Sequence, residues 1–430
     1  MPTTRCAARR PRHASVRAAG TAAVLTSCLL LPAATAAHAD DPQPPATMST
    51  VGGDLLGEPG TQVRPRPDAD APALPDDVTA RAWIVADAES GDVLASHNAH
   101  WPLAPASTLK MLFADVVLPK LDKDTTHKVK PSDLEGMGEG SSKVGIKEDL
   151  TYTVHDLWLG VFLRSGNDAV HVLAAMNGGV DKTVKEMNAR AQEMNALDTH
   201  VVTPDGYDKP GQTSSAYDLT LFAREGMQNP DFREYVSTVR AQFPGEWEKD
   251  DDGKKKRKHF EIQNTNRLLS GDVGLDPYPG IAGVKNGYTS NAGNTFTGVA
   301  ERDGRVLLVT VMHPSSGGLE VYREAASLLD WGFKADGAVQ PVGELVPPDH
   351  AEADPAGGTG KGASSEGKNP GGASHASLAG ASQASDDSGG MGTAFGVTGG
   401  ALALLTLIGF VVHRRWPLQV PTGRRRRPRN

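Results

Sequence analysis

The sequence predicts a mixed α and β domain of roughly 260 residues between two low-complexity segments. Apolar residues follow the helical period after Pro105, whereas two apolar runs between 296 and 312 flank a turn at Arg302-Asp303-Gly304. One flanking segment is rich in Pro and Asp, and the other in Gly, Ser and Ala, compositions typical of linkers. The expected boundaries are 40–78 for the linker, 79–336 for the folded domain and 337–392 for the tether.

The string Ser107-Thr108-Leu109-Lys110 opens the first predicted helix. One face of this helix is apolar, at Leu109, Leu112, Phe113, Val116 and Val117. Ser107 and Lys110 are then neighbours one turn apart. A serine hydroxyl is a poor nucleophile until a base removes its proton, and burial can lower the pKa of a lysine amine enough for that task. The string Ser365-Glu366-Gly367-Lys368 has the same spacing but no apolar periodicity around it.

The string Ser165-Gly166-Asn167 is expected in a tight turn between two apolar helices. The first helix begins at a capping pattern from Thr153 to Asp156, and the second runs from Asp168 to Met176. The plain interpretation is a polar helix–helix turn with Asn167 as the N-cap. In the functional interpretation, Ser165 relays a proton between Lys110 and a leaving amine, and the Asn167 amide holds a substrate carbonyl.

The string Lys285-Asn286-Gly287 follows an apolar run and precedes two predicted strands, which indicates the edge of an antiparallel sheet. Gly287 would let a substrate backbone approach closely, and Lys285 would place a fixed positive charge in the cleft. Each of the three strings is common alone. In this order they supply a nucleophile, a base and a cationic strand for acyl transfer through a serine ester.

These residues resemble the serine-type D-alanyl-D-alanine carboxypeptidases, the low-molecular-mass penicillin-binding proteins. The similarity extends from about Ala80 to Phe333 and includes further strings: Ile84 to Ala88, Gly140-Ser141-Ser142, Thr199-His200, Pro204-Asp205-Gly206, Asn264 to Leu268 and Asp330 to Phe333. The resemblance implies a β-lactamase/transpeptidase-like fold, an antiparallel sheet flanked by helices. It also implies a mostly helical lobe from about Lys120 to Gly226.

The resemblance also implies roles for the site residues. Ser107 would form the acyl-ester, Lys110 would be its general base, and Ser165 would complete the catalytic set. The implied substrate-binding residues are Asn167, Lys285, Asn286, Tyr288, whose backbone N–H joins that of Ser107 in an oxyanion hole, and Arg323, which would hold a terminal carboxylate. The family usually has Thr where Asn286 stands, so we hypothesise that Asn286→Thr preserves or raises activity. No cofactor is implied.

The implied activity is removal of the terminal D-Ala from peptidoglycan stem peptides, with β-lactams as inhibitors. Three alternatives stay open: a serine β-lactamase, a DD-endopeptidase or transpeptidase, and a non-catalytic penicillin- or wall-binding protein. A class A β-lactamase would also carry a Glu-x-x-Leu-Asn loop, which is not found before Lys285.

Composition narrows the chemistry further. Both cysteines, Cys6 and Cys28, lie within residues 1–39, which are predicted below to be a signal peptide. The thirteen histidines show no metal-ligand spacing, so no metal site is expected. The formal net charge is −8, and without the twelve arginines of the two ends it becomes −20 for residues 40–412, which argues against a nucleic-acid partner. The run from Lys254 to Lys258 is predicted to be a solvated hairpin tip.

The two ends of the chain predict export and a membrane anchor. Residues 1–39 combine arginines, an apolar run and a small-residue cleavage site, which indicates a signal peptide; Leu25 to Cys28 also resembles a lipoprotein signal. Residues 393–412 are a charge-free run of 20 residues, long enough for a transmembrane helix. The basic tail 413–430 would be cytoplasmic. We therefore expect a single-pass protein of the cell membrane with an extracytoplasmic catalytic domain.

Overall fold

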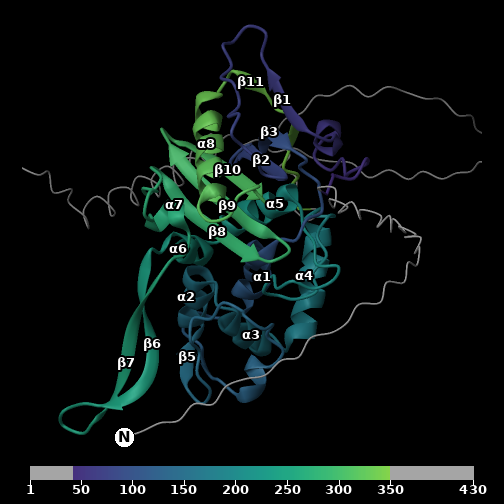
Figure 1. Ribbon diagram of the computed structural model, residues 1–430. Coiled ribbons are helices and arrows are strands. Elements are labelled where there is room, and N and C mark those ends of the chain that lie inside the picture. Colours follow the sequence, from purple (N-terminus) through teal and green to yellow (C-terminus); the bar gives the residue numbers. More distant parts are fainter. Residues whose placement is uncertain (1–41, 349–430) are drawn as a thin grey trace, which may run out of the picture. The chain divides into compact units, whose positions relative to one another are not determined.

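The computed structural model describes residues 42–348 (Figure 1). The predicted signal peptide, the transmembrane segment 393–412 and the basic tail lie outside the described residues, as does Ser365. Within 42–348, every helix is too short or too polar to cross a membrane.

An antiparallel sheet forms the centre of the described chain. Its strands are β1 (Thr61–Pro65), β2 (Ala82–Asp87), β3 (Asp92–His97), β8 (Ile281–Thr289), β9 (Gly293–Arg302), β10 (Arg305–Met312), β11 (Val339–Gln340) and β12 (Gly343–Glu344). They lie in the order β11-β1-β3-β2-β10-β9-β8, and β12 pairs with β3. The expected turn at Arg302-Asp303-Gly304 joins β9 to β10, and β8 is an edge strand, so both predictions are confirmed.

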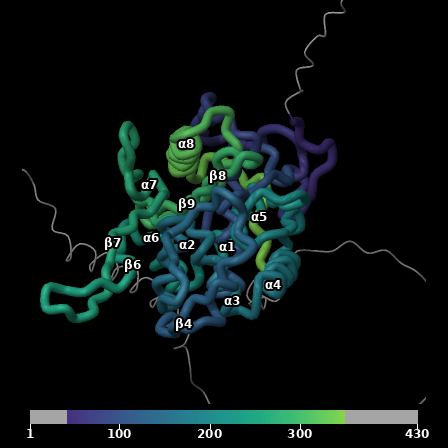
Figure 2. Tube along the Cα trace, turned by 60° about the horizontal axis from the view of Figure 1, so that its bottom comes forward, coloured from purple at the N-terminus to yellow at the C-terminus, as the bar shows by residue number. Residues whose placement is uncertain are grey.

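Helices cover the sheet and build the lobe beside it (Figures 1 and 2). They are α1 (Lys110–Val117), α2 (Val154–Arg164), α3 (Asn167–Met176), α4 (Val180–Glu193), α5 (Ala216–Gly226), α6 (Pro230–Ser237), α7 (Arg267–Ser270) and α8 (Glu320–Lys334), with short 3-10 turns η1 (Asp54–Gly57), η2 (Ala106–Leu109), η3 (Leu118–Lys120) and η4 (Pro131–Leu134). The mixed α/β class and the helical lobe are therefore as predicted.

Alternation along β2 shows how the sheet divides the hydrophobic core. Ala82, Ile84 and Ala86 face the core shared with α1, α2 and α5. Trp83 and Val85 face the opposite core, under α8. This period of two is expected for a central strand that is covered on both faces. The sheet thus holds the N-terminal end of α1 and the edge strand β8 in fixed relative positions.

Two hairpins complete the described chain. The small one pairs β4 (Thr126–Lys128) with β5 (Thr151–Thr153), and the long one pairs β6 (Arg240–Lys249) with β7 (Lys255–Gln263). Figures 1 and 2 show the long hairpin projecting from the body beside the lobe. The turn of this hairpin precedes Lys254, and residues 255 to 258 form the start of β7, so the lysine-rich run leads away from the hairpin tip and does not form the tip itself as predicted.

The folded domain extends beyond the predicted boundaries of 79 and 336. β1 pairs with β3 and β11, β12 pairs with β3, and Leu56 is fully buried. Residues 40–78 and 337–392 are therefore not linkers throughout, since each contributes strands to the sheet. The sequence pattern that would predict these strands is weak, because β1 carries one apolar side chain besides its proline, and β11 and β12 have two residues each.

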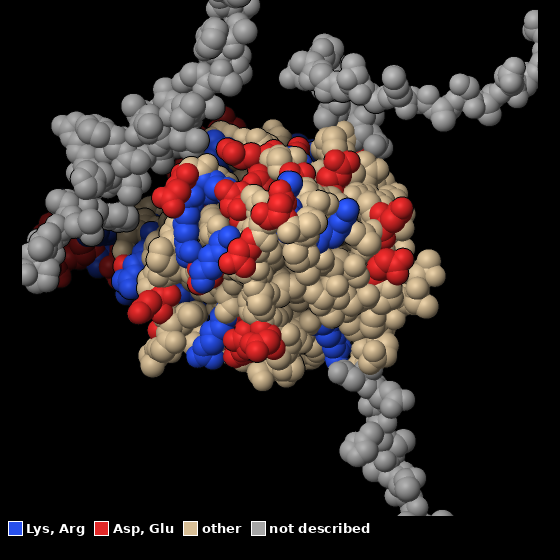
Figure 3. Space-filling view, turned by 90° about the horizontal axis from the view of Figure 1, so that it is seen from above, with Lys and Arg blue, Asp and Glu red and all other residues tan. Residues whose placement is uncertain are grey.

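Acidic and basic residues are mixed on one face of the molecular surface. On the face shown in Figure 3, basic and acidic side chains lie close to one another instead of forming a continuous basic patch.

Candidate active site

The nucleophile turn lies at the start of α1, where η2 leads into the helix. The turn is fixed to the sheet because the hydroxyls of Thr108 and Thr295 both donate to the carbonyl of Pro105, at 2.5 and 3.0 Å. Lys110 is fully buried, whereas Ser107 is partly exposed. Ser107 lines a pocket of about 260 Å³, together with residues of the lobe and of the β8–β9 turn.

The Lys110 amine has three hydrogen-bond partners. Its Nζ lies 2.6 Å from Ser107 Oγ, 2.8 Å from Asn167 Oδ1 and 2.7 Å from the backbone oxygen of Asp205. Burial lowers the pKa of Lys110 to about 8, although the carboxylates of Asp205 and Asp168 act in the opposite direction. A lysine amine whose pKa lies near neutral pH, and which is in hydrogen-bond contact with a serine hydroxyl, is a suitable general base.

The turn between α2 and α3 supplies the next part of the site. The Thr153–Asp156 capping box is present at the start of α2, as predicted, and Ser165 ends this helix in the left-handed region with φ of 55°. Asn167 is the first residue of α3 and not its N-cap. Its side chain accepts from Lys110 and donates to Ser141 Oγ at 3.1 Å. The role of Ser165 as a proton relay stays a prediction, because the three partners of the Lys110 amine are other groups.

The edge strand β8 closes the site opposite the lobe. A Cβ on Gly287 would lie 2.7 Å from the backbone nitrogen of Ser107, so glycine is required here for the strand to approach the nucleophile turn. We expected this glycine to admit substrate backbone, but the space beside it is occupied by η2. Tyr288 follows and is 69% exposed at the pocket. The backbone of residues 287 and 288 therefore lies beside the Ser107 N–H.

Lys285 differs from the expectation of a fixed cation in the cleft. It is buried, and its Nζ donates to the backbone oxygen of Asn286 at 2.6 Å. Burial, followed by the charge of Lys110, lowers the pKa of Lys285 well below its usual range.

Asn286 and Arg323 do not line the pocket. The Asn286 side-chain oxygen accepts from Thr265 Oγ1 at 3.0 Å. Arg323 lies on α8, half exposed, and its Nη1 contacts Glu320 at 3.3 Å. Asn286 is thus a residue of the edge strand β8 and Arg323 a residue of the helix α8, the contacts described for them are not with the nucleophile, and their substrate-binding roles stay predictions.

Sequence reasoning missed the support beneath Lys110. Asp205 is buried, its backbone accepts from Lys110, and its carboxylate lies 3.7 Å from His171 Nε2. Although burial alone would raise the pKa of the Asp205 carboxyl, the His171 hydrogen bond and the Lys110 charge hold it at about 2. The string Pro204-Asp205-Gly206 was noticed as part of the resemblance, but a backbone acceptor leaves no side-chain signature.

One group of potential metal ligands lies apart from this pocket. Among the described residues, His100, Asp198 and Asp218 bring ligand atoms within 4.8 Å of one another. Both nitrogens of His100 already have partners, Asp198 at 2.6 Å and the Val51 carbonyl at 3.0 Å. None of the three residues lines the Ser107 pocket, so the acyl-transfer geometry is independent of them.

Comparisons with known proteins agree with this geometry. The protein-family model described as D-alanyl-D-alanine carboxypeptidase, Peptidase_S11, matches residues 68–316. The D-alanyl-D-alanine carboxypeptidase DacB2 of Mycobacterium tuberculosis is 39% identical over 261 residues, which cover 60% of this chain and 83% of that protein. DacD of Escherichia coli is 32% identical over 60% of this chain and 64% of its own length, so less than two thirds of that protein is matched.

Solved structures show the same similarity in three dimensions. A crystal structure of a D-alanyl-D-alanine carboxypeptidase from Mycobacterium tuberculosis matches with a TM-score of 0.56 and 37% identity, over 66% of this chain and all of that one. The Streptomyces K15 DD-transpeptidase matches with a TM-score of 0.53 and 25% identity, over 61% of this chain and 99% of that one. Sequence and structure comparisons thus identify the same family and the same fold.

Proposed function

The chain belongs to the D-alanyl-D-alanine carboxypeptidase family of serine peptidases, and from this premise we propose that it removes the terminal D-Ala of peptidoglycan stem peptides through an acyl-enzyme on Ser107. The observation that carries the proposal is the 2.6 Å contact between Ser107 Oγ and the fully buried Lys110 amine. Burial of a lysine amine costs free energy, so its position beside a pocket-lining serine indicates a chemical role.

The Lys110 contacts define how the base would work. A neutral amine has two N–H groups and one lone pair. Asn167 Oδ1 and the Asp205 carbonyl are acceptors only, so each takes one N–H. The lone pair is then left for the Ser107 hydroxyl, whose proton it accepts as Oγ attacks the substrate carbonyl.

The remaining steps follow from the bonds that form and break and from the path of the proton. The Ser107 Oγ–carbon bond forms, and the negative charge on the carbonyl oxygen is stabilised by the backbone N–H groups of Ser107 and Tyr288. Collapse breaks the bond between the two D-alanines, and Lys110 returns the proton to the departing amine. Water then hydrolyses the ester, with Lys110 as base again. The close packing of Gly287 on the nucleophile turn supports this choice of oxyanion donors.

The test is release of D-alanine from a synthetic stem pentapeptide by the purified full-length protein. Ser107→Ala should abolish release, whereas Ser365→Ala, a matched change in the second S-x-x-K string, should leave it unchanged. Incubation with penicillin should add the mass of one β-lactam, mapped to Ser107. Continued turnover by Ser107→Ala would refute the assignment.

We further propose that the catalytic domain acts outside the cell and is held at the membrane by residues 393–412. The support is the sequence alone, since the signal peptide and this apolar run lie outside the described residues. Protease added to intact cells should remove the domain, and a chain ending at residue 392 should appear in the medium. A protected domain would contradict the proposal.

A further inference from the structure

One wall of the Ser107 pocket comes from a stretch of chain without regular secondary structure. Residues 139 to 142 line the pocket, and the described residues 135–150, between η4 and β5, form no helix or strand. The stretch includes the string Gly140-Ser141-Ser142, which has no role in the mechanism above. Without a helix or sheet to pair its backbone, this wall depends on other groups for its hydrogen bonds.

The buried carboxylate of Asp168 accepts three of these hydrogen bonds. Its Oδ1 accepts from the Val144 N–H at 3.0 Å, and its Oδ2 accepts from the N–H groups of Gly145 and Ile146 at 2.8 and 2.9 Å. Asp168 is 1% exposed, and burial of a carboxylate is costly unless such donors surround it. Hydrogen bonds to an ionised acceptor are also stronger than those between neutral groups. Asp168 and the wall therefore hold one another in place.

Asn167, the residue before Asp168, joins the wall to the base. Its backbone N–H donates to the Ser142 carbonyl at 2.8 Å, and its Nδ2 donates to Ser141 Oγ at 3.1 Å. Its Oδ1 accepts from the Lys110 amine at 2.8 Å. Asn167 and Asp168 are the first two residues of α3, so the start of this helix fixes the pocket wall and the Lys110 amine together.

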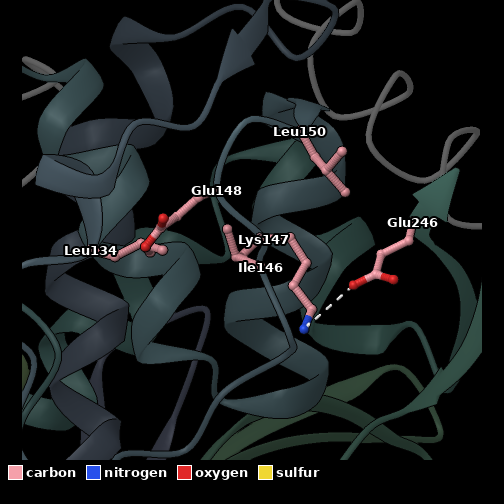
Figure 4. Close-up of a pocket in the computed structure, with 6 residues that line it drawn as sticks. All are labelled: Leu134, Ile146, Lys147, Glu148, Leu150 and Glu246. Atoms are coloured by element: carbon pink, nitrogen blue, oxygen red, sulfur yellow. Dashed lines mark ion pairs between the residues drawn. The ribbon is translucent and has the colours of Figure 1, made fainter.

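The far end of the stretch is held more weakly. Figure 4 shows Lys147 and Glu246 of β6 pointing toward one another, with their charged groups 3.6 Å apart. Their side chains are 57% and 68% exposed, and ion pairs in contact with water contribute little. The Lys147 N–H also donates to the Tyr152 hydroxyl at 3.1 Å. The buried Asp168 carboxylate is therefore a stronger restraint on the wall than the Lys147–Glu246 pair.

Asp168 also affects Lys110 through its charge. Burial lowers the pKa of Lys110, and the carboxylates of Asp205 and Asp168 oppose this effect. The other titratable groups in this cluster are Lys285, whose own pKa is lowered by burial and by the charge of Lys110, and His171, which lies 3.7 Å from the Asp205 carboxylate. Without the negative charge of Asp168, the Lys110 amine should stay neutral to a lower pH.

We propose that Asp168 is a positioning residue for acyl transfer at Ser107, which holds the pocket wall at residues 144–146 and, through Asn167, the amine of Lys110. This inference rests on the proposed function. Asp168 does not line the pocket, so it acts through these groups and not on the substrate. Small displacements of a base or of a substrate-binding wall greatly slow a reaction that depends on precise orientation.

Two variants of the full-length protein separate the geometry of Asp168 from its charge. Asp168→Asn removes the charge and places an NH2 group against backbone N–H donors, whereas Asp168→Glu keeps the charge on a longer side chain. The rate of Ser107 acylation by penicillin is followed by intact mass as a function of pH, and its plateau should fall about tenfold to a hundredfold in both variants. In Asp168→Asn the inflection should also move to lower pH, whereas in Asp168→Glu it should stay in place. A loss of folded protein would lower the plateau without moving the inflection.

The matched control is Glu324→Gln. Glu324 is also a buried carboxylate, on α8, and it accepts from the backbone N–H groups of Thr79 and Ala80 at 3.0 and 3.1 Å. This variant should keep the acylation rate per folded molecule and the inflection of the unmodified protein. Hydrogen exchange at residues 144–146 should be faster in both Asp168 variants and unchanged in Glu324→Gln.

The inference would be overturned by an unmoved inflection in Asp168→Asn, by an equal loss of rate in Glu324→Gln, or by unchanged hydrogen exchange at residues 144–146 in the Asp168 variants. Acylation of the unmodified protein without release of D-alanine from the stem pentapeptide would refute the proposed function and leave this inference standing. Absence of acylation would refute both.

Discussion

Lysines at the active site and lysines on the long hairpin illustrate how much the surroundings of one residue type decide. Lys110 and Lys285 are 0% and 1% exposed, and their amines contact protein atoms at 2.6 to 2.8 Å. Lys258 is 64% exposed, with one contact at 3.7 Å to Glu248. The buried amines lose their hydration and become candidates for proton transfer, whereas the hairpin lysine remains a hydrated surface charge. Motif spacing alone cannot separate these two situations.

Replacing the buried base should give the largest effect. Lys110→Met keeps much of the side-chain volume but removes the amine, so acylation of Ser107 by penicillin should slow by about 10²- to 10⁴-fold. Lys256→Met is the matched change on the hairpin and should have no measurable effect. The second-order acylation rate, followed by intact mass, checks both. Equal rates in the two variants would remove the distinction between the two regions.

The rate of Ser107 acylation should depend on pH through the buried Lys110. Lys110 must be neutral to accept the Ser107 proton, and its pKa is about 8. Acylation should therefore rise about tenfold per pH unit below pH 8 and level off above it. The slope should disappear in Lys110→Met, whose residual rate lacks this base. A flat profile for the unmodified protein between pH 6 and pH 8 would argue against Lys110 as the base.

The pocket wall should respond more weakly than the base. The Tyr207 hydroxyl donates to the backbone oxygen of Glu139 at 2.9 Å, which ties the turn after Asp205 to the loop that lines the pocket. Tyr207→Phe removes about 1 kcal/mol of hydrogen bonding, so KM should rise about fivefold with little change in kcat. Steady-state kinetics on the pentapeptide measure this. A selective fall in kcat would place Tyr207 in the chemical step instead.

A smaller effect is expected at Asn286, in the edge strand β8. Its side-chain oxygen accepts from Thr265, and a threonine hydroxyl can accept the same hydrogen bond. Asn286→Thr should therefore keep kcat/KM within about threefold of the original or raise it. A loss of a hundredfold would show that the site is built around the amide.

The smallest effect belongs to the hairpin. Lys258→Ala removes an exposed pair with Glu248, and such pairs contribute about 0–1 kcal/mol. The Tm measured by calorimetry should change by no more than about 2 °C. A larger shift would mean that the hairpin is stabilised by its charges and not by its contacts with the lobe.

Several parts of the molecule could be predicted from the sequence because the signal was local. The apolar face of α1, the capping box of α2 and the β9–β10 turn each depend on residues that are close together in the sequence, and each is present in the structure. Ser107 and Lys110 follow from the same local logic, since one helical turn separates them.

Other parts depend on contacts between distant segments and could not be predicted. β1 is a strand because β3 and β11 pair with it, and its own five residues carry little pattern. The Asp205 carbonyl supports Lys110 from 95 residues away, through the backbone. Lys285 is buried in β8, on which η2 and α6 pack, and a lysine in a sequence gives no sign of how much water surrounds it.

The order of strands has a mechanical consequence. β11, next to the last described residues, lies at one end of the sheet, and β8 lies at the other, six strand spacings or roughly 30 Å away. A pulling force applied at residue 348 would act first on the two short pairings of β12 with β3 and of β11 with β1. These two pairings could separate while β8, β9 and β10 stayed hydrogen-bonded to one another. The edge that carries β11 and β12 would therefore yield to force before the edge strand β8 beside the nucleophile turn.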